Sequence, residues 1–189
     1  MQTNVEKIFS FIDQEATYIE EQESAPYLEG IVYALELWLE NKKAPDLVNP
    51  KKEEIRKAIQ LAILKGMSKS TQANHQMTPD AIGLLLSYFV KEMNKEKKEL
   101  SFLDPALGTG NLLFTLMNVI PNTSHAFGVE IDELLIQLAA QVGELLEQDI
   151  QLFRQDAIRP LMIDPVDIVV SDLPVGSVSY THLTLPTKA

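Results

Sequence analysis

The sequence contains no cysteine and only three histidines among its 189 residues. The absence of cysteine excludes disulfide bonds and thiolate metal sites. The histidines, His75, His125 and His182, lie too far apart along the chain to predict a compact zinc site. We therefore expect no metal ion in the chemistry of this chain.

Long apolar runs are also missing, and none reaches the roughly 18 residues that a membrane-spanning helix needs. The first residues, MQTNVEKIF, are polar and acidic where a secretory signal would be basic and then apolar. The apolar fraction is 46%, which is high enough to predict a folded core. These features predict a globular cytoplasmic protein that has no membrane partner.

Basic residues are few: 16 lysines and arginines stand against 27 acids, giving a formal charge of −11. Proteins that bind nucleic acids usually present a basic face to the phosphates. Two basic clusters, KKEEIRK at 51–57 and KEKK at 95–98, include glutamates at helical spacing. That spacing is typical of solvated helix faces, so the clusters do not predict a nucleic-acid-binding surface.

The first 70 residues have apolar side chains spaced three or four apart, which predicts a helical N-terminal domain at 1–70. Within it, Asn49-Pro50 predicts the start of a helix and Gly66 its end. The polar segment 67–76 predicts a linker to a second domain at 71–176. Thr78 is then expected to cap a helix whose buried face includes Ile82, Leu85, Leu86, Phe89 and Val90.

From residue 100, short strand-like runs alternate with helical ones. The predicted strands are LSFLD, HAFGVEI, IQLFRQD and DIVVSD, and the predicted helices begin at Asn111 and Asp132. Strands that alternate with helices of this length form parallel sheets with right-handed crossovers. The sequence therefore predicts an α/β fold, a Rossmann-like doubly wound sheet that is incomplete, after the helical N-terminal domain.

The last residues do not continue this alternation. VSYTHLTLPTKA, at 178–189, resembles the translation of a transposon-end sequencing adapter; the alternative is a native strand with a polar end. We expect residues 177–189 to be a non-native tail, with native sequence stopping near Gly176 and the natural protein continuing beyond it.

The strongest local motif is FLDPALGTGNLL at 102–113. It places an acid-proline pair at the end of a predicted strand and a Gly-x-Gly turn before a helix. Because glycine lacks a Cβ atom, such a turn lets a ligand approach the backbone closely. Glu130, twenty residues after Gly110, ends the next predicted strand, where a carboxylate can accept hydrogen bonds from ribose hydroxyls.

Two kinds of cofactor compete for this motif. A dinucleotide site would have a third glycine where Leu113 stands, and its pyrophosphate would lie next to the Asp104 carboxylate. S-adenosyl-L-methionine has no phosphate, and it carries a cationic sulfonium and an α-amino group. Electrostatics therefore favour S-adenosyl-L-methionine.

The segment Asp104–Leu113 resembles the cofactor-binding motif of N6-adenine-type amino-methyltransferases, and the chain looks like their YtxK-type branch over about 70–176. The resemblance implies that Glu130 holds the ribose, Asp156 faces the adenine amino group and Thr78 contacts the cofactor carboxylate. It also implies that one backbone segment surrounds the methionine part. The expected residues of that segment are Asp104, Pro105, Ala106, Gly108, Gly110 and Asn111.

The catalytic motif of the family is an acid or amide, two prolines and an aromatic, and this chain has Asp172-Leu173-Pro174-Val175. The resemblance implies that the Asp172 carboxylate and the Leu173 carbonyl accept hydrogen bonds from an exocyclic amino group. Leu173 replaces the first proline, and Val175 replaces the aromatic that would stack on a flipped base.

The expected reaction is methyl transfer from S-adenosyl-L-methionine to adenine N6 in DNA. One alternative is an N-methyltransferase that acts on protein or RNA. Another is a binding module that keeps the fold and the cofactor pocket without catalysis, which the departures at Leu173 and Val175 would fit.

Overall fold

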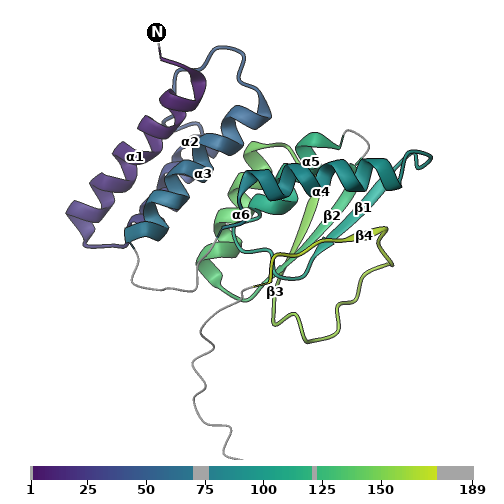
Figure 1. Ribbon diagram of the computed structural model, residues 1–189. Helices are drawn as coiled ribbons and strands as arrows, with labels where there is room; N and C mark the ends of the chain where they lie inside the picture. The colour runs from purple at the N-terminus through teal and green to yellow at the C-terminus, as the bar shows by residue number, and fades with distance from the viewer. Residues whose placement is uncertain (1, 70–76, 121–122, 174–189) are drawn as a thin grey trace, which may run out of the picture.

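Three helices form the N-terminal part of the computed structural model, which describes residues 2–69, 77–120 and 123–173 (Figure 1). They are α1 (Asn4–Glu23), α2 (Tyr27–Leu39) and α3 (Lys52–Lys69). Helix α1 begins with a capping box, in which the Glu6 N–H donates to the Thr3 hydroxyl and the Thr3 N–H donates to the Glu6 carboxylate. The helical prediction for this part of the chain is therefore confirmed.

Gly66 does not end its helix, so that expectation is wrong. Helix α3 continues to Lys69, and Gly66 lies inside it against α2. A Cβ atom at position 66 would lie 2.5 Å from Leu28 Cδ2, so glycine is needed here for close helix packing. The start of the helix also differs, since α3 begins at Lys52 rather than directly after Pro50.

A four-stranded parallel sheet forms the second part of the structure. Its strands are β1 (Leu100–Asp104), β2 (Thr123–Glu130), β3 (Ile150–Arg154) and β4 (Ile168–Val169), in the spatial order β3-β2-β1-β4. Helix α5 (Asn111–Val119) joins β1 to β2, and α6 (Glu133–Leu145) joins β2 to β3. The predicted α/β fold with parallel strands is confirmed, and so are the helix starts at Asn111 and after Asp132.

The chain reverses its direction across the sheet at β1. Strands β1, β2 and β3 follow one another outward, and β4 then returns to pair with the opposite side of β1. In a parallel sheet, this reversal opens a crevice at the carboxyl ends of the strands, where ligands commonly bind. The residues that follow β1, β2 and β4 therefore gather at one edge.

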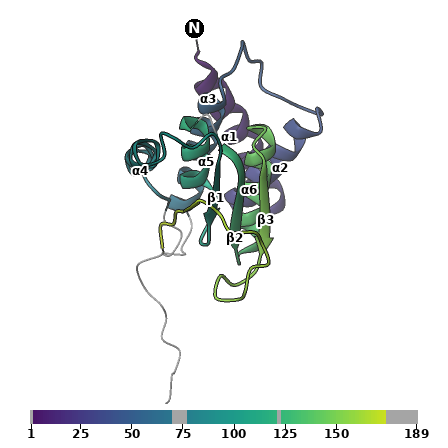
Figure 2. The same ribbon diagram turned by 90° about the vertical axis from the view of Figure 1, so that its right-hand side faces the viewer.

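The N-terminal helices pack directly against the helices of the sheet, α2 against α6 and α3 against α5. The Gln141 side chain on α6 donates to the Val32 carbonyl on α2 at 3.0 Å. Buried apolar residues form one continuous core from Ile8 on α1 to Val170 after β4. Figure 1 shows α1, α2 and α3 on one side of the molecule, and in Figure 2, seen from the opposite side, they lie behind the sheet and its helices.

Helix α4 (Asp80–Met93) buries only part of the predicted face, namely Val90 and, less completely, Leu86. Leu85 and Phe89 are 50% and 48% exposed, whereas Gly83, Ser87 and Val90 are buried. Small residues face α5 because the helices approach so closely that a Cβ at Gly83 would lie 2.9 Å from a methyl group of Thr115. An exposed apolar arc remains on α4, formed by Ile82, Leu84, Leu85, Tyr88, Phe89 and Met93. Within the described part of the chain, no helix is long and apolar enough to cross a bilayer.

Replacing Leu85 or Phe89 by glutamine should lower the fluorescence of bound 1-anilinonaphthalene-8-sulfonate, because this dye binds exposed apolar surface. The same substitutions should change the free energy of unfolding by less than about 1 kcal/mol, as surface changes usually do. Val90→Ala on the buried face is the matched control and should cost roughly 2 kcal/mol. Equal losses of stability at positions 85 and 90 would contradict the exposed arc.

Candidate active site

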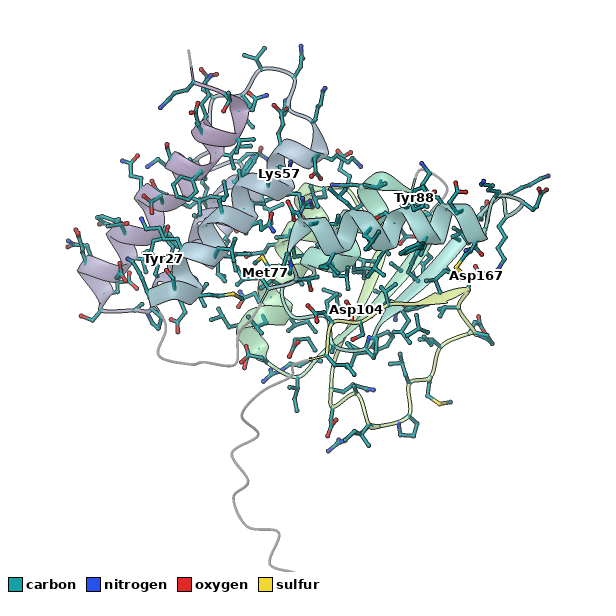
Figure 3. All side chains as sticks on the ribbon, viewed as in Figure 1. Tyr27, Lys57, Met77, Tyr88, Asp104 and Asp167 are labelled. Atoms are coloured by element: carbon teal, nitrogen blue, oxygen red, sulfur yellow. The ribbon has the colours of Figure 1, made fainter. Side chains whose placement is uncertain are left out.

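Three carboxylates meet at the carboxyl edge of the sheet. Asp104 ends β1, Glu130 ends β2, and Asp172 follows β4 by three residues. Asp104 is only 1% exposed, and Figure 3 shows it at the end of its strand beside the segment that leads to β4. The negative charges of both Glu130 and Asp172 act on Asp104, so the structure brings three of the predicted site residues together.

The environment of the Asp104 carboxyl group disfavours its ionised form. Burial raises the pKa of Asp104 to about 6, and Glu130 and Asp172 act in the same direction, while a hydrogen bond from the Ala106 N–H at 3.0 Å opposes them. The ion pairs among the described residues include none of these three carboxylates. A cationic group bound here would relieve this repulsion.

The turn after β1 has the backbone conformation that its glycines permit. Gly108 and Gly110 have φ angles of +57° and +80°, a left-handed region that other residues rarely adopt. A Cβ at Gly110 would lie 2.3 Å from the Phe114 ring, whereas a Cβ at Gly108 would meet no atom within 4 Å. Gly110 is therefore required by packing, and Gly108 leaves an open side where a ligand can approach the backbone.

Glu130 holds this turn in place through its carboxylate. Its Oε2 accepts the Gly108 N–H at 2.8 Å, and its Oε1 accepts the N–H groups of Ile131 and Asp132 at 2.8 and 2.9 Å. Each carboxylate oxygen can accept about two hydrogen bonds, so Oε2 can accept one more. The side chain is therefore pre-oriented and still able to bind a hydroxyl group.

Thr78 does not cap α4 through its side chain, contrary to expectation. The N-cap of α4 is Pro79, which lacks a side-chain donor or acceptor, and the Thr78 hydroxyl instead donates to Asp172 Oδ2 at 2.8 Å. Thr78 is buried, and its carbonyl accepts a hydrogen bond from Asn111 Nδ2 at 2.9 Å. The structure thus connects Thr78 directly with the residue expected to be catalytic.

Asn111, the first residue of α5, makes contacts that the sequence did not indicate. Its amide oxygen accepts a hydrogen bond from Arg56 at 2.7 Å, so both ends of the amide are already bonded to protein groups. Arg56 lies in the cluster at 51–57 that was expected to be solvated, but its side chain is only 2% exposed. That expectation is wrong for Arg56, although Lys51, Lys52 and Lys57 are exposed. The sequence feature that could have predicted the burial of Arg56 is its position next to Ile55, at the edge of the buried apolar stripe of α3.

Asp156 lies in the turn that follows β3. Its Oδ1 accepts the Ile158 N–H at 3.0 Å, and the neighbouring Gln155 N–H donates to the Glu130 carbonyl at 3.2 Å. Asp156 therefore sits next to the end of β2, at the same edge of the sheet. Leu173 is 62% exposed, and Pro105 and Ala106 lie in the turn after β1. Pro174, Val175, His75 and the tail 177–189 lie outside the described residues.

A family model for the YtxK N-terminal helical domain matches residues 34–67, which include the C-terminal part of α2 and most of α3. The chain is 54% identical to the Bacillus subtilis protein YtxK over 125 residues, which are 66% of this chain and 38% of that protein. A solved structure from Listeria monocytogenes, assigned to the class I S-adenosylmethionine-dependent methyltransferases, superposes with a TM-score of 0.85 at 38% identity. That match covers 92% of this chain and 59% of the Listeria protein.

Two more distant structures show the same fold. One is the methyltransferase subunit of a type I restriction-modification system from Streptococcus thermophilus, with a TM-score of 0.58, 15% identity and 89% of this chain covered, but only 43% of its own. The other, from Vibrio vulnificus, is assigned as a modification subunit of a type I restriction enzyme, with a TM-score of 0.51 and 19% identity over 74% of this chain and 32% of its own. This chain thus spans less than two thirds of each of these relatives.

Asp104→Asn should stabilise the ligand-free protein at pH 7, because it removes a buried charge. The folded-state pKa of about 6 lies above the usual 3.8, so the wild-type carboxylate disfavours folding above pH 6. This cost disappears as the pH falls from about 7 to 4, and it reaches roughly 3 kcal/mol, from 1.4 kcal/mol per pKa unit. Denaturant unfolding of both proteins across this range should show a stability difference that shrinks towards acid pH.

Asp167→Asn provides a control in which the change in stability has the opposite sign. The Lys97 ammonium and the N–H and hydroxyl of Ser101 lower the pKa of Asp167 to about 2, so its ionised form favours folding. That variant should be destabilised above pH 4, and the difference should vanish as the pH falls to 2. A stability difference for Asp104→Asn that does not change with pH would contradict the buried charge.

Proposed function

We propose that this chain forms the S-adenosyl-L-methionine site of a methyltransferase that modifies an amino nitrogen. The main observation is the group of three carboxylates, Asp104, Glu130 and Asp172, which no basic residue of the described chain neutralises. The likeness to the Listeria methyltransferase, over 92% of this chain, supports the same function.

The chemistry of the site fits this cofactor better than it fits a dinucleotide. The α-ammonium and the sulfonium of S-adenosyl-L-methionine are cations, and both would reduce the repulsion around the buried Asp104 carboxylate. The pyrophosphate of a dinucleotide would instead add negative charge beside it. The open side of Gly108 leaves room for the ligand at the backbone of the turn.

The residues would have separate tasks in holding the cofactor. The backbone from Asp104 to Gly110 would surround the methionine part, Glu130 Oε2 would accept a ribose hydroxyl, and Asp156 would face the adenine amino group. Thr78 would contact the cofactor carboxylate through its backbone, since its hydroxyl proton is donated to Asp172. When bound, the cofactor supplies an electrophilic methyl group on its sulfonium sulfur.

Asp172 is the proposed acceptor for the amino group that is methylated. Its carboxylate is exposed, and one oxygen is held by the Thr78 hydroxyl, so the other is free to accept a hydrogen bond from substrate. A hydrogen bond to the amino group would orient the nitrogen lone pair and favour loss of its proton after transfer. Orientation of this kind supplies a large part of the acceleration without a strong base.

Adenine N6 in DNA is the substrate we favour. The support is the position of Asp172 in a motif that resembles the one of N6-adenine methyltransferases, and the shared fold of two restriction-modification subunits. Leu173 and Val175 favour an alternative, a binding module that keeps the cofactor site without catalysis. An amino group in RNA or protein is the other alternative.

The protein should bind S-adenosyl-L-methionine in a calorimetric titration, and Glu130→Ala should weaken the binding at least about tenfold. The expected size follows from the loss of a hydrogen bond to a charged group, together with loosening of the turn at Gly108. The matched control is Glu133→Ala, because Glu133 lies three residues later and pairs with Arg154 at the surface. Its affinity should stay within about twofold of wild type.

The two variants separate the possible outcomes. Loss of affinity in Glu130→Ala alone supports the proposed site. Equal affinity in wild type and Glu130→Ala would mean that the cofactor binds at another site. Absence of binding by wild type would overturn the proposed function.

At saturating S-adenosyl-L-methionine, Asp172→Ala should lower the rate of methyl transfer to DNA roughly 100-fold, because the lost acceptor acts on the substrate nitrogen. Asp172→Asn keeps one acceptor oxygen and should lose less. The measurement is transfer of radiolabelled methyl groups to duplex DNA, compared with DNA in which 2-aminopurine replaces adenine and the 6-amino group is absent.

The choice of acceptor decides between the candidate functions. Label in normal DNA but not in 2-aminopurine DNA supports adenine N6. Label in RNA or protein instead would overturn the DNA assignment, and cofactor binding without transfer to any acceptor would favour the binding module.

A further inference from the structure

Arg56 is a buried cation on α3, a helix of the N-terminal part. All of its donor groups are used: its Nε and Nη2 donate to the two Glu53 oxygens at 2.8 and 2.7 Å, and its Nη1 and Nη2 donate to the two Asp80 oxygens at 3.0 Å each. Nη1 also donates to Asn111 Oδ1 at 2.7 Å. The guanidinium therefore joins three elements, α3, α4 and α5, at one point.

From Arg56, a series of hydrogen bonds reaches the candidate active site. Asn111 accepts from Arg56 and donates through Nδ2 to the Thr78 carbonyl at 2.9 Å. Thr78 then donates through its hydroxyl to Asp172 Oδ2 at 2.8 Å. The Asn111 amide accepts through its oxygen and donates through its nitrogen, so its two bonds polarise one another. Thr78 connects its carbonyl bond with its hydroxyl bond by position alone.

Arg56 also restrains Thr78 from its other side. Asp80, two residues later, is the first residue of α4 and binds the guanidinium through both oxygens. The N-cap of α4 makes no side-chain hydrogen bond, so this helix start is restrained through Asp80, by the bidentate contact with Arg56 and by a hydrogen bond from Gln60 Nε2 at 2.8 Å. Thr78 is thus held between two groups that both depend on Arg56.

The electrostatics show how strongly this cluster depends on the cation. Burial would raise the pKa values of Glu53 and Asp80, but the Arg56 guanidinium lowers both below their usual range. The same two carboxylates raise the pKa of Arg56, against the effect of its own burial. Buried ion pairs cost desolvation that apolar packing avoids, and their best-supported benefit is a fixed geometry.

We infer that Arg56 is a positioning residue of the active site, acting on Asp172 through Asn111 and Thr78. This inference rests on the proposed methyltransferase function for its effect on catalysis. It makes the N-terminal helices part of the catalytic unit, because one of them supplies the group that orients Thr78 and the start of α5.

Arg56→Lys is the informative substitution, because lysine keeps the charge but cannot make the planar, five-donor set of hydrogen bonds. We expect it to weaken S-adenosyl-L-methionine binding or slow single-turnover methyl transfer by roughly tenfold, since small misplacements of reacting groups are costly. Lys65→Met is the matched control: it removes a cation from the same helix that binds Asp13 on α1, away from the site. Its affinity and rate should stay within about twofold of wild type.

Thr78→Val tests whether Arg56 acts through the Thr78 hydroxyl. If it does, Arg56→Lys should have little further effect in the Thr78→Val background, because the two substitutions break the same connection. Independent effects that multiply, with no coupling in this cycle, would overturn the inference. Thermal melts of each variant show whether it is folded.

Amide hydrogen exchange supplies a measurement that does not need methyl transfer. Arg56→Lys should speed exchange at 168–173, where the Val170 N–H donates to the Leu103 carbonyl at 2.9 Å, although Arg56 has no direct contact with that segment. Lys65→Met should leave this segment unchanged. Unchanged exchange in Arg56→Lys would overturn the inference, whether or not the protein is active.

If wild type neither binds the cofactor nor transfers methyl groups, the proposed function fails. Faster exchange at 168–173 in Arg56→Lys would still support the connection from Arg56 to Asp172.

Discussion

Parallel pairing of the strands is the constraint on which the site depends. Because β1, β2 and β4 all point the same way, the residues that follow them come to one edge of the sheet, however far apart they lie in the sequence. In this chain those residues include Asp104, Glu130 and Asp172. Three acids near one another are costly when no cation is bound, and that cost is the physical basis for expecting a cationic ligand.

The helices are organised by close approach rather than by large apolar side chains alone. Gly66 lets α3 reach α2, and Gly83 lets α4 reach α5. The buried guanidinium of Arg56 connects α3 with α4 and α5, and it requires acids and an amide around it. The N-terminal helices and the sheet are therefore joined by both a shared apolar core and a polar cluster with a defined geometry.

Local patterns predicted much of the fold and the positions of several site residues. The strands at 100–104 and 150–154, the helix at Asn111 and the glycine turn follow from periodicity and from the conformations that glycine allows. Apart from the start of α3, the errors concern contacts between elements. Thr78 donates a hydrogen bond to a residue 94 positions away. Helix α4 buries its small residues because α5 approaches closely. The spacing of residues along the sequence predicts neither contact. Arg56 looked solvated because its buried acceptors come partly from α4 and α5.

The ladder between β4 and β1 contains two residue pairs, Phe102 with Ile168 and Leu103 with Val169, and further hydrogen bonds join Asp167 to Ser101 and Val170 to Leu103. These pairs close a loop of more than sixty residues, whereas β1, β2 and β3 are joined by short crossovers. Contacts of long sequence separation form slowly and short ladders open easily, so β4 should be the last strand to dock during folding and the first to detach. Asp172 follows this strand by three residues, so we expect assembly of the site to be the final step of folding. A ligand that contacts Asp104 and Asp172 together would therefore stabilise the pairing of β4 with β1.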